Sequence, residues 1–281
     1  MRLAVSNIAW PPEADADAAA LLVDHGVTGV EIAPARVCER PWEAPAARVA
    51  AYRGFWEDRG LPIVALQALL FGRGDLVLFG DAATRRRLFD HLAAIIDLAA
   101  GLGARRLVFG SPKNRARGEL GLADAEALAV GFFRDVGQRA ADRGVWLCIE
   151  PNPVQYGCDF LVDSRQVIRF VERVEQRGLG VHLDTGGMSL AGESPAAVIA
   201  AAGTRWRHFH ASEPHLVPLG DGGVDHPAVA AALRAAGYEG WVSVEMVQGP
   251  PGTSWRERLR AALAVAQAAY LGAGAARAGA A

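Results

Sequence analysis

Four side chains able to bind a metal ion stand at the ends of apolar segments in the second half of the sequence. These residues are Glu150, Asp184, His210 and Glu245. Glu150 follows the apolar run 146–149 and precedes Pro151-Asn152-Pro153, which ends a strand because proline cannot donate a ladder hydrogen bond. The four positions are 34, 26 and 35 residues apart, and each interval fits one strand-helix unit. Three carboxylates and an imidazole brought to one edge would form a divalent-metal site.

Such a site suits proton transfer at a carbon next to a carbonyl group. Removing that proton leaves an enediolate, whose negative charge a divalent ion stabilises. Two carboxylates on opposite sides of the substrate could take up and return the proton, and Glu150 and Glu245 are the candidates. The sequence does not distinguish the acid from the base. Any one of the four residues alone could equally be a rim residue satisfied by a helix N-terminus or a salt bridge; four in register favour a site.

Eight strand-like apolar segments alternate with helical segments over residues 1–271. The predicted strands are 3–9, 29–34, 63–69, 106–110, 146–149, 179–184, 206–211 and 241–245. Eight predicted helices lie between or after them, including one from 84 to 102 capped by Thr84, one from 165 to 177 capped by Ser164, and a last one from 254 to 271. Strands separated by helices run parallel through right-handed crossovers, and eight such units close into a (β/α)8 TIM barrel.

We therefore predict the α/β class, with one barrel domain over residues 1–271 and a flexible Gly/Ala-rich tail over 272–281. The alternative is an open doubly wound sheet. It gains no support from the first strand, because no Gly-x-Gly-x-x-Gly turn follows it.

The composition argues against several classes of partner. A net charge of −2 and a pI near 6.4 provide no basic field for nucleic acid or anionic lipid. Three cysteines without CxxC spacing argue against disulfides and a thiolate zinc site, and no signal peptide or membrane-length apolar run is present. We expect a cytoplasmic protein with a small-molecule substrate. Apolar residues on the Ala-rich helices could also pair subunits into a homo-oligomer.

Four motifs resemble those of a known superfamily. The segments are 148–151 (CIEP), 181–185 (VHLDT), 207–211 (RHFHA) and 244–245 (VE), and they are similar to the sugar phosphate isomerase/epimerase superfamily with the xylose isomerase-like barrel. The similarity runs from Leu3 to about Leu271. It implies that Glu150, Asp184, His210 and Glu245 bind one divalent ion, with manganese, cobalt or magnesium expected and zinc as an alternative. It also implies that Glu150 and Glu245 transfer protons in a ketose, sugar acid or related polyol.

The sequence departs from the epimerase pattern at two places. Epimerases of this superfamily commonly have a histidine three residues after the aspartate, where this chain has Gly187, and many have an arginine where it has Leu216 and Val217. A metal-dependent lyase or dehydratase using the same enolate chemistry is therefore the alternative function, and a non-catalytic barrel subunit is a third. A DNA-repair endonuclease with the same barrel is not favoured. Such enzymes need more histidines, for a cluster of three zinc ions, and a basic surface, and this chain has neither.

Other polar residues near strand ends are weaker candidates. Those that could contact substrate hydroxyls or acidic groups are Asn7, Gln67, Lys113, Asn152, Tyr156 and Glu213, and Arg115 shares the loop of Lys113. A capping or structural role suits each of them as well. His182 and His208 share strand parity with Asp184 and His210, so we expect them inside the barrel, supporting the ligands by hydrogen bonds or packing in the core.

Overall fold

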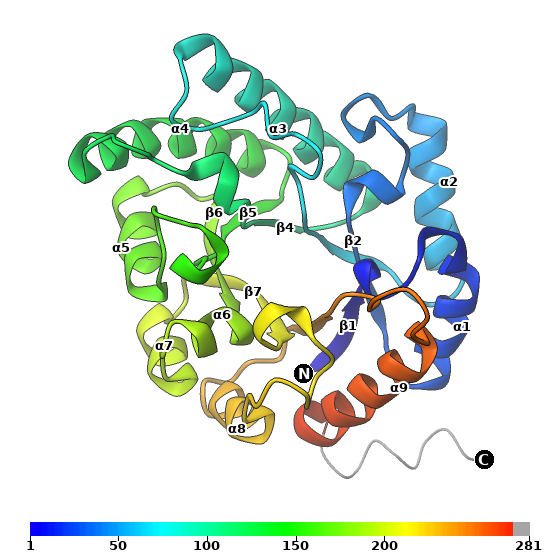
Figure 1. The fold of residues 1–281 in the computed structure, drawn as a ribbon. Helices are drawn as coiled ribbons and strands as arrows, with labels where there is room; N and C mark the ends of the chain where they lie inside the picture. The colour runs from blue at the N-terminus through cyan, green and yellow to red at the C-terminus, as the bar shows by residue number, and fades with distance from the viewer. Residues whose placement is uncertain (272–281) are drawn as a thin grey trace.

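The computed structural model describes residues 1–271, so the predicted tail 272–281 lies outside the described residues. Eight parallel strands close into a barrel in sequence order, and the helices surround it (Figure 1). The strands are β1 (Arg2–Ser6), β2 (Gly29–Ile32), β3 (Ile63–Leu66), β4 (Arg106–Phe109), β5 (Trp146–Ile149), β6 (Leu179–Asp184), β7 (Trp206–Ser212) and β8 (Trp241–Glu245). Because β1 pairs with β8, the sheet has no free edge. The predicted TIM barrel is confirmed, and the open sheet is excluded.

Nine α-helices lie in the described residues, one more than predicted. They are α1 (Asp15–Asp24), α2 (Ala46–Glu57), α3 (Ala82–Leu102), α4 (Leu122–Asp142), α5 (Ser164–Val174), α6 (Thr185–Leu190), α7 (Pro195–Ala202), α8 (His226–Ala235) and α9 (Trp255–Ala266), which continues into the π-helical turn η8 (Gln267–Leu271). The additional helix is α6, which begins directly after β6. Its two glycines are poor helix formers, but the Asp184 carboxylate accepts the Gly187 N–H and caps the first turn.

Two predicted helix caps and two strand ends are wrong. Asp81 and Asp163 cap α3 and α5, because their carboxylates accept backbone N–H groups three residues ahead, so the helices start before Thr84 and Arg165. The strands predicted over 3–9 and 63–69 stop at Ser6 and Leu66. The first is followed by a 3-10 turn, η1 (Asn7–Ala9), and the second by a positive φ of 53° at Ala68.

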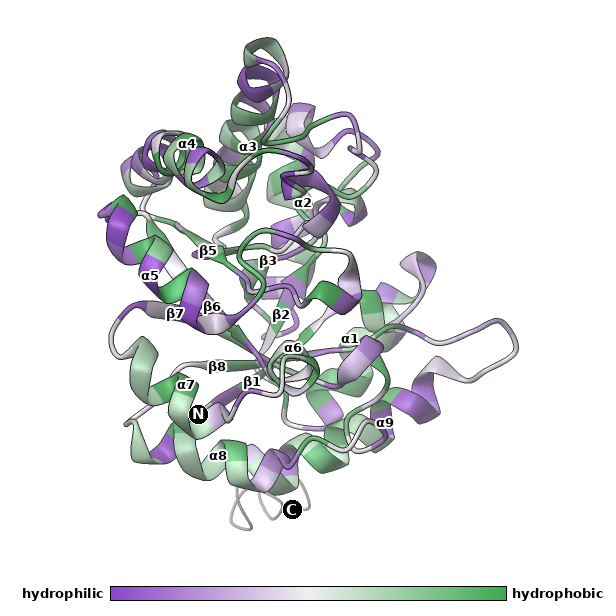
Figure 2. Cartoon of the chain, turned by 60° about the vertical axis from the view of Figure 1, so that its left-hand side comes forward, coloured by the Kyte–Doolittle hydropathy of each residue, from purple (hydrophilic) through white to green (hydrophobic). Residues whose placement is uncertain are grey.

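The barrel has an apolar outside and a polar inside. Alternate strand residues such as Leu3, Val5 and Phe209 pack outward against the helices, whose apolar and polar sides are distinguished in Figure 2. The inward residues include a fully or nearly buried polar set, namely Ser6, Glu31, Gln67, His182, His208, His210 and Ser243. The strands therefore deliver hydrogen-bonding and charged groups to the barrel axis. Among residues 1–271, no helix has both the length and the apolar character needed to cross a membrane.

Candidate metal centre

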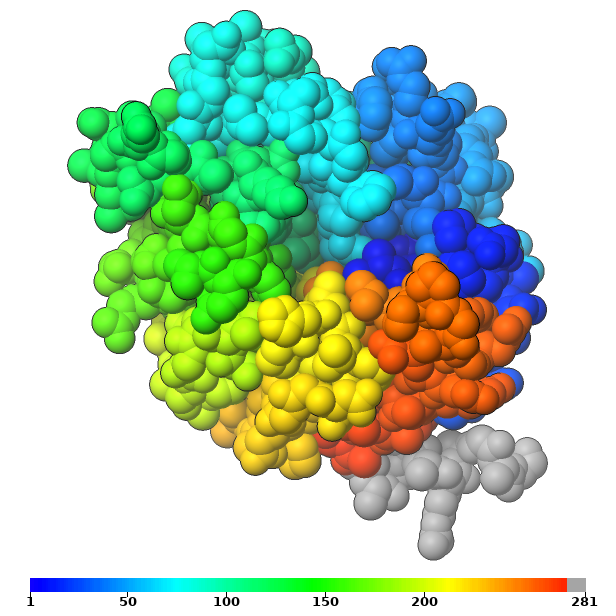
Figure 3. Space-filling model, viewed as in Figure 1, coloured from blue at the N-terminus to red at the C-terminus, as the bar shows by residue number. Residues whose placement is uncertain are grey.

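The C-terminal ends of β5 to β8 bring the four predicted ligands together. Strand pairing sets Asp184 beside His210, and Ser212 beside Glu245, while Glu150 directly follows β5. The His210 Nδ1 atom lies 3.2 Å from Glu245 Oε2 and 4.0 Å from Asp184 Oδ2. Ligand atoms of Glu150, Asp184 and His210 lie within 4.8 Å of one another. We call Glu150, Asp184, His210 and Glu245 the rim site. The space-filling view along the barrel shows a hollow at the centre of this face (Figure 3).

The rim site concentrates negative charge in a buried place. Burial, together with the charges of Asp184 and Glu245, raises the pKa of Glu150 to about 8. Burial and the charge of Glu245 likewise raise the pKa of Asp184 to about 6. Both shifts have the two causes expected for carboxylates that share a buried site, namely loss of hydration and mutual repulsion. A divalent ion bound at the rim would offset the repulsion between these carboxylates.

The orientation of His210 fits a metal ion at the rim. Its Nε2 atom lies 2.9 Å from Glu31 Oε2, while its buried Nδ1 atom faces the rim and lies 3.2 Å from Glu245 Oε2. Burial alone would lower the pKa of His210, but Glu31 and Glu245 hold it well above its usual value. A carboxylate behind a histidine fixes which nitrogen is free to bind a metal. One imidazole nitrogen and three carboxylates form a donor set suited to manganese, cobalt, magnesium or zinc.

Glu31 is a site residue that the sequence analysis missed. It is fully buried on β2, where Ser243 Oγ donates to Oε2 at 2.5 Å and His208 Nε2 lies 3.4 Å from Oε1. Burial would raise the pKa of Glu31, but the imidazoles of His210 and His208 hold it well below the usual range. The available signal was a carboxylate within the otherwise apolar strand Gly29–Ile32.

Glu150 and Asp184 are held by neighbours on the adjoining segments. Asn152 Nδ2 donates to Glu150 Oε2 at 3.0 Å, and Ser212 Oγ donates to Asp184 Oδ2 at 2.5 Å. Gly110, at the end of β4, leaves room for Glu150, because a Cβ atom there would lie 2.2 Å from Glu150 Oε2. The buried Arg115 donates to the Glu150 carbonyl at 2.7 Å, so its loop supports the rim from behind.

His182 and His208 both lie inside the barrel, but at different depths. His182 Nε2 is 3.5 Å from Glu150 Oε1, and His182 belongs to a compact donor group with Glu150, Asp184 and His210. Burial lowers the pKa of His182 well below its usual value, and the charges of His210 and His208 lower it further. His208 contacts Glu31 instead. His182 therefore borders the rim site directly, whereas His208 lies one layer below it.

The predicted substrate-contact residues fall into two groups. Asn152 and Tyr156 stand by the rim: Asn152 contacts Glu150, and the Tyr156 hydroxyl accepts the His215 N–H at 3.0 Å. Burial raises the pKa of Tyr156, and the nearby charges of Asp184, Glu150 and Glu245 raise it further. Lys113 is exposed on the turn η5 (Pro112–Arg115) after β4.

The remaining three candidates have structural partners. Asn7 Oδ1 accepts the Ala33 N–H at 2.9 Å, and Gln67 Nε2 donates to Ser6 Oγ at 3.1 Å. Glu213 is fully buried and accepts the Gly220 and Val224 N–H groups at 2.8 and 3.0 Å. These contacts fasten the ends of β1 and β3 and the loop after β7.

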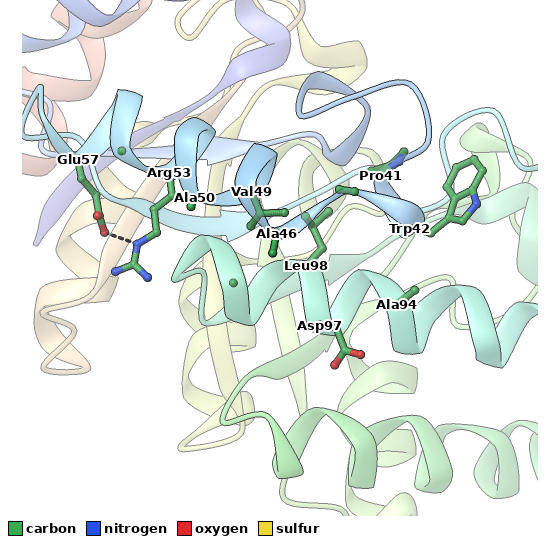
Figure 4. Close-up of a pocket in the computed structure, with 13 residues that line it drawn as sticks. Pro41, Trp42, Ala46, Val49, Ala50, Arg53, Glu57, Ala94, Asp97 and Leu98 are labelled. Carbon is green, nitrogen blue, oxygen red and sulfur yellow. Dashed lines mark hydrogen bonds and ion pairs between the residues drawn. The ribbon is translucent and has the colours of Figure 1, made fainter.

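A second hollow lies on the outside of the barrel, between α2 and α3 (Figure 4). It has a volume of about 490 Å³ and is lined by Trp42, Val49 and Leu98, with the Arg53–Glu57 ion pair at one end. None of the predicted site residues lines it. The rim site is therefore separate from this surface groove.

Comparison with known proteins identifies the family. The family model for the xylose isomerase-like TIM barrel matches residues 19–265. A ketose 3-epimerase of Arthrobacter globiformis is 34% identical over 170 residues, which cover 59% of this chain and 57% of that protein. An L-ribulose 3-epimerase of Methylomonas sp. (strain DH-1) is 29% identical over 119 residues, covering 42% of this chain and 41% of that protein. Each match thus spans less than two thirds of the relative.

Solved structures share the fold over most of the chain. A D-psicose 3-epimerase in the presence of D-fructose has a TM-score of 0.78 at 22% identity, covering 96% of this chain and 99% of that one. The IOLI protein with a bound zinc atom has a TM-score of 0.74 at 18% identity, with 95% and 97% covered. At these identities the likeness concerns the fold. From the match of the family model over residues 19–265, the chain belongs to the xylose isomerase-like TIM barrel family.

Proposed function

We propose that the protein is a divalent-metal-dependent epimerase or isomerase of a small ketose, sugar acid or related polyol. The observation that carries this proposal is the convergence of Glu150, Asp184, His210 and Glu245 at the rim. The names of the curated relatives, a ketose 3-epimerase and an L-ribulose 3-epimerase, support a sugar substrate.

The four rim residues would hold the ion, with manganese, cobalt or magnesium expected and zinc as the alternative. A divalent ion at this position supplies positive charge that stabilises the enediolate oxygens of the substrate. The zinc atom in the IOLI protein supports a metal in this fold. Because His210 Nε2 is hydrogen-bonded to Glu31, Nδ1 is the nitrogen that would bind the metal ion.

Glu150 and Glu245 would move the proton. They stand at the ends of β5 and β8, three strands apart around the barrel, so a substrate in the hollow lies between them. Epimerisation requires a proton to leave one face of a carbon and return to the other, which two flanking carboxylates can do. Asn152 and Gly110 position the Glu150 carboxylate. Asn152, Tyr156 and Lys113 would contact substrate oxygens.

The test is solvent-deuterium exchange at the substrate carbon, measured on a panel of ketoses and sugar acids with added manganese. Glu150→Gln and Glu245→Gln should each reduce exchange by about 10²–10⁴-fold, the usual contribution of a positioned acid or base. Glu119→Gln is a matched control, because Glu119 is exposed on the loop before α4. Circular dichroism checks that the variants fold. Undiminished exchange in both rim variants would contradict the proposal.

A lyase or dehydratase reaction is the second candidate. Gly187 supports this alternative, because it has no side chain at the position where epimerases of the superfamily commonly have a histidine. Its N–H donates to Asp184 Oδ1 at 2.5 Å. Product analysis distinguishes the two reactions, since a dehydratase yields a product lighter by one water and an epimerase yields an isomer. A purified protein that binds no stoichiometric metal and turns over no substrate would instead favour a non-catalytic barrel.

A further inference from the structure

A cavity of about 330 Å³ lies at the opposite end of the barrel from the rim site. Its walls come from the N-terminal ends of the strands: Arg2 begins β1, Ile63 begins β3, Arg106 begins β4 and Trp241 begins β8. A single water molecule needs only about 10–15 Å³ of such space, so the cavity is many times larger than one water. The cavity therefore has room for a small organic or inorganic anion. We call it the floor cavity.

The floor cavity is lined by four arginines and by no aspartate or glutamate. The arginines are Arg2, Arg105, Arg106 and Arg207. Within residues 1–271, none of them forms an ion pair, whereas Arg205, two positions before Arg207, pairs with Glu172 at 2.7 Å. Unpaired guanidinium groups gathered in one place repel one another, and they favour a bound anion that accepts hydrogen bonds from several of them.

Stacking and carbonyl contacts hold these guanidinium groups in place. Arg2 lies over the Trp241 ring at 4.1 Å, and Arg106 over the Trp146 ring at 4.7 Å. Arg106 Nε, on β4, donates a hydrogen bond to the backbone carbonyl of Arg207, on β7, at 3.0 Å. The buried Nε atom of Arg207 has no hydrogen-bond partner. Arg2 and Arg106 are thus held in place without an acidic partner, which reduces the entropy cost of binding an anion.

The floor cavity reaches into the barrel. His208, which is 1% exposed, forms part of its wall and contacts Glu31 on the inner side. Burial is the main cause that lowers the pKa of Arg106; Cys148 and Tyr238 act in the opposite direction, and the charges of Arg207 and Arg105 lower the pKa by a smaller amount. An anion here would lie below the polar interior and apart from the rim ligands.

We propose that the floor cavity binds a small anion bearing phosphate or carboxylate groups, held by the guanidinium groups of Arg2, Arg105, Arg106 and Arg207. Both groups offer several oxygens at the spacing of an arginine fork. The site is independent of the proposed reaction at the rim.

Isothermal titration calorimetry on the full chain tests this proposal, with inorganic phosphate and succinate as separate probes and with chloride replacing either probe at equal ionic strength. Saturable binding of at least one probe is expected, and the stronger probe identifies the preferred group. Arg106→Gln combined with Arg207→Gln should weaken binding by about tenfold or more, because two charge-assisted contacts are lost. Arg177→Gln is the matched control, since Arg177 is exposed before β6 and does not line the cavity.

A second double variant tests the same cavity in case the first variant does not fold. Arg2 and Arg105 are exposed, so Arg2→Gln combined with Arg105→Gln removes two charges without disturbing the interior, and it should also weaken binding. Binding should persist in Glu245→Gln, which separates the floor cavity from the rim site. The proposal is overturned if neither probe binds saturably, or if Arg177→Gln weakens binding as much as the floor variants do.

Discussion

The two ends of the barrel carry opposite charges. At the C-terminal ends of the strands, Glu150, Asp184 and Glu245 surround one imidazole, and no arginine or lysine forms an ion pair with them in the described part of the chain. At the N-terminal ends, four arginines surround a cavity that no carboxylate lines. Elsewhere, opposite charges on neighbouring helices neutralise each other, as in the Arg139–Asp97 pair at 2.5 Å.

Like charges gathered in one place on a scaffold indicate the sign of the charge on the ligand that binds there. Carboxylates brought together in a buried place are stabilised by a cation, and guanidinium groups by an anion. Between the two ends lies a closed polar interior, in which Glu31 contacts His210 on one side and His208 on the other. The rim should therefore respond to cations and the floor cavity to anions.

Metal removal should have the largest effect, and only through the rim. Treating the protein with a chelator should abolish solvent-deuterium exchange, and added manganese should restore it. An ion present at 100 times its Kd should also stabilise the fold by about 2.7 kcal/mol, because it binds the native state alone. Thermal unfolding with and without manganese measures this shift. An unfolding temperature that does not respond to manganese, cobalt, magnesium or zinc would show that the rim does not bind a cation.

Glu31→Gln should weaken metal binding by about 10–100-fold, the usual effect of removing a carboxylate behind a ligand histidine. The substitution keeps the volume but removes the charge that orients His210. Titration of metal-free protein with manganese gives the Kd. Glu39→Gln, at an exposed position after β2, should leave the Kd unchanged. Equal Kd values for the two variants would separate Glu31 from the rim site.

Gly110→Ala should lower kcat by about 100-fold, as expected when a catalytic group moves by about 1 Å. The added methyl group would overlap Glu150 Oε2, so the carboxylate has to shift. Gly131→Ala on α4 is the control, because a Cβ atom there meets nothing within 4 Å. Steady-state kinetics with matched metal loading measures both variants. A normal kcat for Gly110→Ala would show that the position of Glu150 tolerates such a shift.

Thiol reactivity tests whether the interior between the two ends is closed. Burial raises the pKa of Cys148 to about 12, so this thiol stays protonated and unreactive between pH 7 and pH 9. Cys38 is half-buried and should react first with a thiol reagent in the native protein, while Cys148 reacts only after unfolding. Mass spectrometry of the labelled peptides identifies the site. Rapid labelling of Cys148 in the native state would mean that solvent enters the barrel from one end.

Arg2→Gln should have the smallest effect on stability, about 0.5–1 kcal/mol, because it removes an exposed stack on Trp241. Urea denaturation measures the change in the free energy of unfolding. A loss of several kcal/mol would mean that the floor arginines support the fold itself rather than an anion.

The fold and the four rim residues could be predicted from the sequence alone. Apolar runs alternating with helical segments are local features, and a barrel places the ends of consecutive strands on one rim. For this reason Glu150, Asp184, His210 and Glu245 could be grouped from their positions at strand ends alone. Their roles as ligands and proton carriers remain predictions. The helix α6 is not predicted from the sequence, because two glycines weaken its helical pattern and its cap is the side chain of Asp184, which is also a predicted metal ligand.

The residues that support the rim and those that line the floor cavity could not be predicted without the three-dimensional structure. Glu31 meets His210 across 179 positions of sequence, and Arg106 meets Arg207 across 101. Gly110 matters only because the Glu150 carboxylate occupies the space beside it. Such contacts depend on strand register and on closure of the barrel, which bring together inward side chains from strands that are not neighbours. Local periodicity carries no information about such contacts, so the floor cavity and the residues behind the rim ligands follow only from the folded chain.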